Sequence, residues 1–153
     1  MTVPCFLDTN ILIYAASKDE PRKRKITNSL IDGGAFGLSA QVLAEFYATS
    51  TRKMRPPLST DTARAWVDLL SQQHCVAVDA GIVKSGIEVS ERYGISYWDG
   101  AIIAAAEAAG APVVYTEDLN HGQVYGTVTA INPFVDHETG FHEPRPARFE
   151  GAG

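Results

Sequence analysis

Short apolar runs alternate with helix-like segments along most of the chain. The runs suit buried strands and cover residues 3–7, 35–39, 75–78, 112–116 and 128–131. Several segments between them begin at a capping residue or a first-turn proline and end at glycine, which predicts helices over 10–16, 22–31, 41–52, 59–72, 79–93 and 96–109. Short strands that alternate with helices are typical of βα units, in which helices cover both faces of a parallel sheet. The pattern therefore predicts an α/β fold with a central parallel sheet of four or five short strands.

The periodicity stops near residue 133, where Pro, His, Glu and Gly become frequent. We therefore expect one folded domain over residues 1–132 and an irregular or disordered tail over 133–153, which suits a chain of 153 residues. Two cysteines are too few for a disulfide scaffold, and the longest purely apolar run, over 101–106, is too short to cross a bilayer. No secretory signal is visible. These features favour a cytoplasmic protein without a membrane span.

Positive charge is unevenly placed along this acidic chain. The net charge of −5 argues against a general nucleic-acid coat. Seven of the 13 Lys and Arg residues nonetheless fall in two short segments, which consist of Arg22, Lys23, Arg24 and Lys25, and of Arg52, Lys53 and Arg55. These segments either form a locally positive surface or are solvated charges of loops and helix ends, and both interpretations stay open.

Two acidic residues follow predicted strands closely. Asp8 comes directly after the run over 3–7, and Asp118 comes shortly after the run over 112–116. Ligands of open α/β sheets bind at the carboxyl ends of the parallel strands, so we expect both carboxylates at one edge of the sheet. The ordinary alternatives are a helix cap for Asp8 and a turn residue for Asp118, and Glu117 competes for any role given to Asp118.

Two further carboxylates lie in predicted helices. Asp99 follows Ser96 by three residues, which is the spacing of a capping box. It also shares one helix face with apolar side chains, namely Ile102, Ile103 and Ala106. A carboxylate in apolar surroundings must be protonated, paired or bound to a metal. Glu45 lies at the edge of the apolar face of its own helix, where a solvated position is the ordinary alternative.

Convergence of these side chains would have a large electrostatic cost. Each pair of carboxylates about 4 Å apart repels by roughly 4 kcal/mol at an effective dielectric near 20. Several such pairs exceed the roughly 5–15 kcal/mol stability of a domain, so either some carboxyls are protonated or a divalent cation neutralises them. Oxygen ligands without cysteine or a histidine cluster favour Mg²⁺ or Mn²⁺ over Zn²⁺. Asn10 could orient Asp8, and Thr116 could donate its hydroxyl to a neighbouring carboxylate.

Taken together, the acidic segments resemble the PIN-domain nucleases, and more closely the VapC-type toxins of toxin–antitoxin pairs. The matching segments are FLDTNILIYA with Asp8, LAEFY with Glu45, YWDGAIIAAAEAAG with Asp99 and VVYTEDLNHG with Asp118, in this order across roughly residues 3–132. The resemblance implies a three-layer α/β/α sandwich with metal-dependent endoribonuclease activity. It further implies a homodimer that is inhibited by a small VapB-type antitoxin lying over the active site.

The resemblance also implies roles for individual residues. By position, Asp8 and Asp99 would be the principal ligands of a Mg²⁺ or Mn²⁺ ion. The other members of the site would be Glu45 and Asp118 in the acidic cluster, with Asn10 and Thr116 at supporting polar positions. The two basic segments are then candidates for binding RNA phosphates around the cluster. Hydrolysis of RNA by such a site would leave a 5′-phosphate and a 3′-hydroxyl.

Other functions use parts of the same pattern. A stand-alone RNA-processing nuclease would employ the same carboxylates without an antitoxin. An aspartyl-phosphate phosphatase would use Asp8 as its nucleophile, although such enzymes usually carry a second Asp two residues on, where this chain has Asn10. A module that only binds RNA or protein has no reason to keep carboxylates that repel one another.

Overall fold

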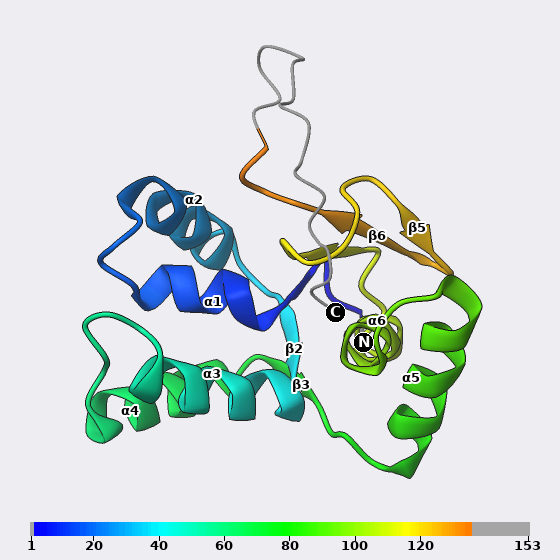
Figure 1. The fold of residues 1–153 in the computed structure, drawn as a ribbon, viewed down its shortest axis with the longest axis horizontal. Coiled ribbons are helices and arrows are strands. Elements are labelled where there is room, and N and C mark those ends of the chain that lie inside the picture. The colour runs from blue at the N-terminus through cyan, green and yellow to red at the C-terminus, as the bar shows by residue number, and fades with distance from the viewer. Residues whose placement is uncertain (1, 136–153) are drawn as a thin grey trace.

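The computed structural model describes residues 2–135, in which helices and short strands alternate (Figure 1). The strands are β1 (Phe6–Leu7), β2 (Gly37–Ser39), β3 (His74–Val76), β4 (Val113–Tyr115), β5 (Val124–Tyr125) and β6 (Val128–Ile131). The helices are α1 (Thr9–Ala16), α2 (Pro21–Asp32), α3 (Ala40–Arg52), α4 (Thr60–Leu70), α5 (Ala80–Tyr93) and α6 (Tyr97–Ala108). Each predicted helix and strand is present, with ends that shift by a few residues.

The strands form one sheet in the order β3-β2-β1-β4-β6-β5. All neighbouring pairs are parallel except β5 and β6, which are antiparallel. This confirms the predicted α/β fold with a central parallel sheet and adds β5 as a sixth strand. Strand β5 could not be predicted from the sequence because it has only two residues and pairs across a tight turn at Gly126, whose φ is +64°. So short a strand has no periodicity to detect.

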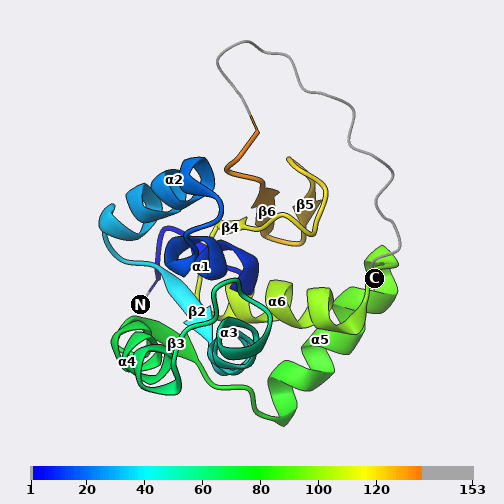
Figure 2. The same ribbon diagram turned by 60° about the vertical axis from the view of Figure 1, so that its left-hand side comes forward.

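Helices cover both faces of the sheet. In Figures 1 and 2, α1 lies with α2 and α3 with α4, whereas α5 and α6 form a separate pair. Helix α6 contacts β2, β4 and β6 directly and lies between the sheet and α5 (Figure 2). Phe6 and Leu7 of β1 are fully buried at the centre of this core. Burial on both faces explains why the strands are apolar runs rather than alternating patterns.

Most helices begin at the polar residues that the sequence suggests. The side chains of five N-cap residues accept a backbone N–H of the following turn, and these residues are Asp8, Ser39, Ser59, Asp79 and Ser96. Helix α2 instead begins with Pro21, whose missing N–H costs nothing at this position. Asp8 directly follows β1, Ser39 is the last residue of β2 and Asp79 ends the loop after β3. At these three caps the end of a strand and the start of a helix are fixed together.

Glycine residues on both helices, Gly86 in α5 and Gly100 in α6, allow the two backbones to pack closely. A Cβ atom on Gly100 would lie 2.5 Å from the carbonyl oxygen of Gly86 and 2.9 Å from the amide nitrogen of Ser90. A Cβ atom on Gly86 would lie 3.0 Å from the Cα of Ala101. Glycine inside a helix has a conformational cost, and here it is offset by a close backbone contact. This contact sets the spacing of α5 and α6 directly beside Asp99, which precedes Gly100.

The predicted domain boundary falls within the described part of the chain, whereas most of the predicted tail lies outside it. Residues 136–153 of that tail are not among the described residues. Phe134, just past the expected boundary at 132, is buried and packs edge to face on Tyr14 at a centroid distance of 5.2 Å. Within the described range, none of the helices has the length and apolar character needed to span a membrane.

Replacement of Gly100 by alanine tests the close contact of α5 and α6. We expect Gly100→Ala to lower the free energy of unfolding by about 2 kcal/mol or more, because the new methyl group meets backbone atoms that cannot rotate away. The matched control is Gly81→Ala near the start of α5, where the new methyl group would meet only a side-chain oxygen of Asp79. Thermal unfolding of both variants measures the difference. Equal stability of the two variants would contradict this account of the packing.

Candidate active site

The carboxyl ends of β1 and β4 lie side by side at one edge of the sheet. The two strands pair in parallel, with Leu7 opposite Tyr115. The backbone N–H of Asp8 extends this pairing by donating to the carbonyl oxygen of Tyr115 at 3.1 Å. Asp8 and the turn that begins at Thr116 therefore leave the sheet at the same point, which is where α/β proteins build their ligand sites.

Asp8 is buried, with only 5% of its surface exposed. Its Oδ1 accepts the N–H of Thr9 at 2.7 Å, and its Oδ2 accepts the hydroxyl of Thr116 at 2.8 Å. Burial raises the pKa of Asp8 to about 7, and the charge of Asp118 adds to the increase, whereas the two hydrogen bonds oppose it. One oxygen of Asp8 caps α1, as the helix-cap interpretation expects, and this cap is compatible with a site role, which stays a prediction.

Asp99 lies in the first turn of α6 and is half-buried. Its N–H donates to the hydroxyl oxygen of Ser96 at 3.1 Å, which is one half of the expected capping box. Burial raises the pKa of Asp99 to about 6, with the charge of Asp118 as the next largest cause. The Ser96 hydroxyl opposes this increase, and the charge of Glu45 adds to it. These effects place Asp99 within the electrostatic reach of both other carboxylates.

Glu45 is held toward α1 by a threonine that sequence analysis missed. The hydroxyl of Thr9 donates to Glu45 Oε1 at 2.8 Å, and Gln41 Nε2 donates to Oε2 at 3.4 Å. Thr9 lies between Asp8 and Asn10, directly after β1, so its position at a strand end was the available signal. Through this bond α1 and α3 are joined at the acidic cluster.

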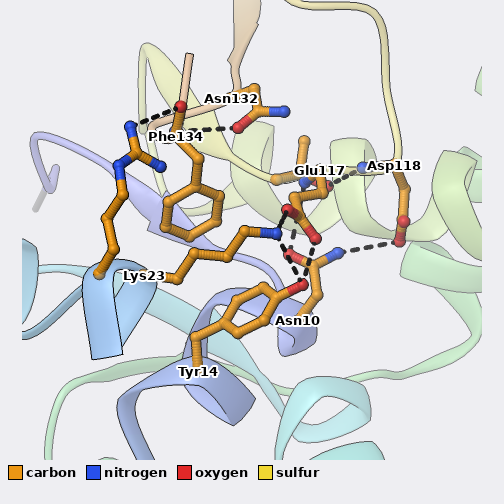
Figure 3. Close-up of polar contacts among 9 residues, drawn as sticks. Asn10, Tyr14, Lys23, Glu117, Asp118, Asn132 and Phe134 are labelled. Atoms are coloured by element: carbon orange, nitrogen blue, oxygen red, sulfur yellow. Dashed lines mark hydrogen bonds and ion pairs between the residues drawn. The ribbon is translucent and has the colours of Figure 1, made fainter. Parts of the chain in front are cut away.

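Asn10 and Thr116 fix the turn that carries Asp118. Thr116 accepts the N–H of Asp118 at 3.0 Å on the same hydroxyl that donates to Asp8. Asn10 Nδ2 donates to Asp118 Oδ2 at 3.0 Å, and its Oδ1 accepts the N–H of Glu117 at 3.4 Å (Figure 3). Thr116 therefore donates to a carboxylate as expected. The expectation for Asn10 differs, because these two hydrogen bonds hold the 117–118 turn rather than Asp8.

The structure separates the candidate RNA-binding cations into two kinds. Lys23 forms an ion pair with Glu117 at 2.6 Å. Arg22 donates to the carbonyl oxygen of Phe134 at 3.2 Å, and Arg55 donates to the carbonyl oxygens of Arg52 and Met54 at 3.0 and 3.1 Å. Apart from the half-buried Lys23, the side chains of both basic segments are exposed, including those of Arg24, Lys25, Arg52 and Lys53. Their contact with RNA stays a prediction.

The acidic residues suit a hard divalent cation in their chemistry. Asp8, Asp99 and Asp118 act on one another electrostatically, and their carboxylate oxygens are ligands that Mg²⁺ and Mn²⁺ prefer. Burial, and after it the charge of Asp118, raises the pKa of both Asp8 and Asp99. In residues 2–135, no three His, Cys, Asp or Glu side chains are grouped tightly enough to hold a metal ion in the present geometry. The residues therefore fit the ion by type and charge, and ligation would require side-chain adjustment.

The raised pKa of Asp8 predicts a pH-dependent stability. The ordinary pKa of 3.8 applies to the unfolded chain, whereas the folded value is about 7. Between these values the folded protein binds a proton that the unfolded chain has lost, so its free energy of unfolding falls as the pH rises from about 4 to about 7. The amide introduced by Asp8→Asn has no such proton, and asparagine caps helices as well as aspartate does. In metal-free buffer, we expect the melting temperature of Asp8→Asn minus that of the wild type to be larger at pH 8 than at pH 5.

Thermal melts in EDTA at several pH values measure this difference, which corresponds to about 1–3 kcal/mol. Asp68→Asn on the exposed face of α4 is the matched control, because it makes the same substitution far from the cluster. A difference between Asp8→Asn and the wild type that does not change with pH would contradict the electrostatic account.

Comparisons with known proteins agree with this geometry. The family model of the PIN domain matches residues 5–126. Solved structures with the same fold include Mycobacterium tuberculosis VapC20, described as a sarcin-ricin loop cleaving toxin, with a TM-score of 0.62, 20% identity and coverage of 74% of this chain and 89% of that one. A toxin–antitoxin complex from Klebsiella pneumoniae has a TM-score of 0.63 and 16% identity, covering 85% of this chain and 98% of that one.

VapBC2 from Rickettsia felis, bound to a DNA fragment from its promoter, has a TM-score of 0.57 and 19% identity, covering 84% of this chain and 97% of the matched chain. No curated protein matches the sequence. At such identities the solved structures support the fold alone, whereas the family model covers most of the chain. The strand-end carboxylates, the parallel sheet and the match over residues 5–126 together establish that this chain belongs to the PIN domain family.

Proposed function

We propose that this protein is a metal-dependent endoribonuclease and the toxin of a toxin–antitoxin pair. The observation that carries the proposal is the convergence of carboxylates at the carboxyl ends of β1 and β4 in a PIN-domain chain. Asp8 and Asp99 have raised pKa values because they are partly or fully buried beside other negative charges. Folded proteins tolerate such repulsion where the charged groups perform chemistry.

Asp8 and Asp99 would hold a Mg²⁺ or Mn²⁺ ion, with Glu45 and Asp118 completing the acidic cluster. A bound ion of this kind supplies an activated water and neutralises charge on the phosphate. The chain's own contribution is orientation. Thr116 and the N–H of Thr9 fix both oxygens of Asp8. Asn10 in turn fixes Asp118 and Thr9 fixes Glu45, so these carboxylates each have a neighbour that limits their rotation.

RNA and an antitoxin are the partners that this function requires. The exposed members of the basic segments are suited to RNA phosphates, because an acidic site must hold a polyanion through cations at its margin. The solved structures with the same fold include toxin–antitoxin complexes, which supports an antitoxin partner. As the resemblance to the VapC-type toxins implies, this antitoxin would lie over the site. We also propose a homodimer, as the resemblance to the VapC-type toxins implies. RNA hydrolysis would leave a 5′-phosphate and a 3′-hydroxyl.

Incubation of the purified protein with total RNA tests the activity. We expect cleavage with Mn²⁺ or Mg²⁺ and none with EDTA, and mapping of the new ends would identify 5′-phosphates. Asp8→Asn and Asp99→Asn should each reduce the cleavage rate on the order of 10³-fold, because each removes a charged ligand while preserving side-chain volume. Asp68→Asn on α4 is expected to match the wild type. Cleavage at the wild-type rate by a correctly folded Asp8→Asn variant would contradict the proposal.

Co-expression tests the proposed antitoxin. A reading frame beside the gene for this chain should encode a small DNA-binding protein that copurifies with it and suppresses its RNA cleavage. The measurement is the cleavage rate of the complex compared with that of the isolated protein. Full activity of the isolated protein, without any neighbouring inhibitor, would favour the stand-alone RNA-processing nuclease.

A further inference from the structure

An aromatic and charged cluster borders the acidic site and joins four segments of the chain. We call it the Lys23 cluster, and it consists of Tyr14 in α1, Lys23 in α2, Glu117 after β4 and Phe134 after β6. Lys23 Nζ lies 2.6 Å from Glu117 Oε2 and 3.2 Å from the hydroxyl oxygen of Tyr14. The Tyr14 hydroxyl donates to Glu117 Oε1 at 2.7 Å. Figure 3 shows the ammonium group between the two rings and pointing at Glu117.

The ammonium group of Lys23 already interacts with a carboxylate and two aromatic rings of this cluster. Its Nζ lies 4.6 Å from the ring centroid of Tyr14 and 5.1 Å from that of Phe134, within the range of cation–π attraction. The side chains of Lys23 and Glu117 are only 25% and 24% exposed. An RNA phosphate would have to displace a carboxylate and a hydroxyl from this half-buried ammonium. Lys23 therefore differs from the exposed cations of the same segment.

Glu117 connects this cluster to the acidic site. Its carboxylate is directed toward α1 and α2 by Tyr14 and Lys23, while its backbone N–H donates to Asn10. The next residue, Asp118, is held by Asn10 and Thr116. The turn over 116–118 is thus held by two sets of contacts. Asn10 and Thr116 hold Asp118, and Tyr14 and Lys23 hold the side chain of Glu117. Loss of the contacts on Glu117 frees a fifth carboxylate beside the cluster and loosens the orientation of Asp118.

From this arrangement we infer that Lys23 is a positioning residue, which holds Glu117 outside the acidic site so that Asp118 keeps its orientation, and that it does not contact RNA. The inference rests on the proposed nuclease function. It revises the expectation from the sequence, in which Lys23 is one of several phosphate-binding cations.

Cleavage kinetics test this role. We expect Lys23→Met to lower kcat about 10-fold at saturating RNA with little change in KM, because a misplaced group affects the reacting geometry more than binding. Lys23→Arg should recover most of the loss, since a guanidinium can pair with Glu117 and stack on the rings. Glu117→Gln should lower kcat similarly, and the double variant with Lys23→Met should be no slower than either single variant. The matched control is Lys84→Met on the exposed face of α5.

RNA binding provides a readout that is independent of cleavage. In the inactive Asp8→Asn background, fluorescence anisotropy with a labelled oligonucleotide gives Kd as a function of salt. Addition of Lys23→Met should leave Kd within about 2-fold and the salt dependence unchanged, as should addition of Lys84→Met. A direct phosphate contact would instead reduce the slope of log K against log salt by about one.

The outcomes separate the inference from the function on which it rests. No metal-dependent cleavage by the wild type would contradict the proposed function. Wild-type cleavage combined with a kcat of Lys23→Met equal to that of Lys84→Met would overturn the inference alone. A raised KM with a reduced salt slope would overturn it as well, and would identify Lys23 as an RNA-binding residue. If Lys23→Met lowered the thermal stability but left kcat unchanged, the cluster would have only a structural role, and this result would also contradict the inference.

Discussion

Burial of carboxylates beside one another is the constraint around which this structure is organised. Asp8 is buried at the end of β1, and Asp118 and Asp99 add their negative charges to its surroundings. Since hydrophobic burial raises the free energy of each ionised form, the fold must hold these groups by other means. It does so with short hydrogen bonds from Thr9, Thr116 and Asn10, each of which comes from the carboxyl end of a central strand. The apolar sheet thus supplies the rigidity, and the strand ends supply the polar contacts.

The ammonium group of Lys23 serves Glu117 rather than the central acidic cluster. The two side chains form an ion pair at 2.6 Å beside the turn that carries Asp118. Tyr14 and Phe134 pack beside this pair, with Nζ of Lys23 4.6 and 5.1 Å from their ring centroids. Burial is the largest cause of the raised pKa values of Asp8 and Asp99, and the charges that act on them are those of neighbouring carboxylates, so a bound ion or protons would have to supply the compensation.

Much of the fold could be predicted from the sequence because its signals are local. Ser59, Asp79 and Ser96 cap helices where expected, and apolar runs mark the central strands. The convergence of Asp8 with Asp118 also follows from strand direction alone. The partners of Asn10 and Lys23 could not be predicted, because each depends on a contact with a residue about a hundred positions away in the chain. Gly86 illustrates the same limit. From the sequence it only weakens a helix, whereas the structure shows that its missing side chain allows α6 to pack closely on α5.

The glycine contact between α5 and α6 bears on how this protein tolerates sequence change. Asp99 stands one residue from Gly100, whose Cα faces backbone atoms of the neighbouring helix. The separation of α6 from α5 beside this aspartate is consequently defined largely by main chain against main chain, with Ser90 Cβ as the nearest side-chain atom. The buried side chains of α6 that pack on the sheet can be exchanged for others of similar size, whereas the two glycine positions leave almost no freedom to evolve.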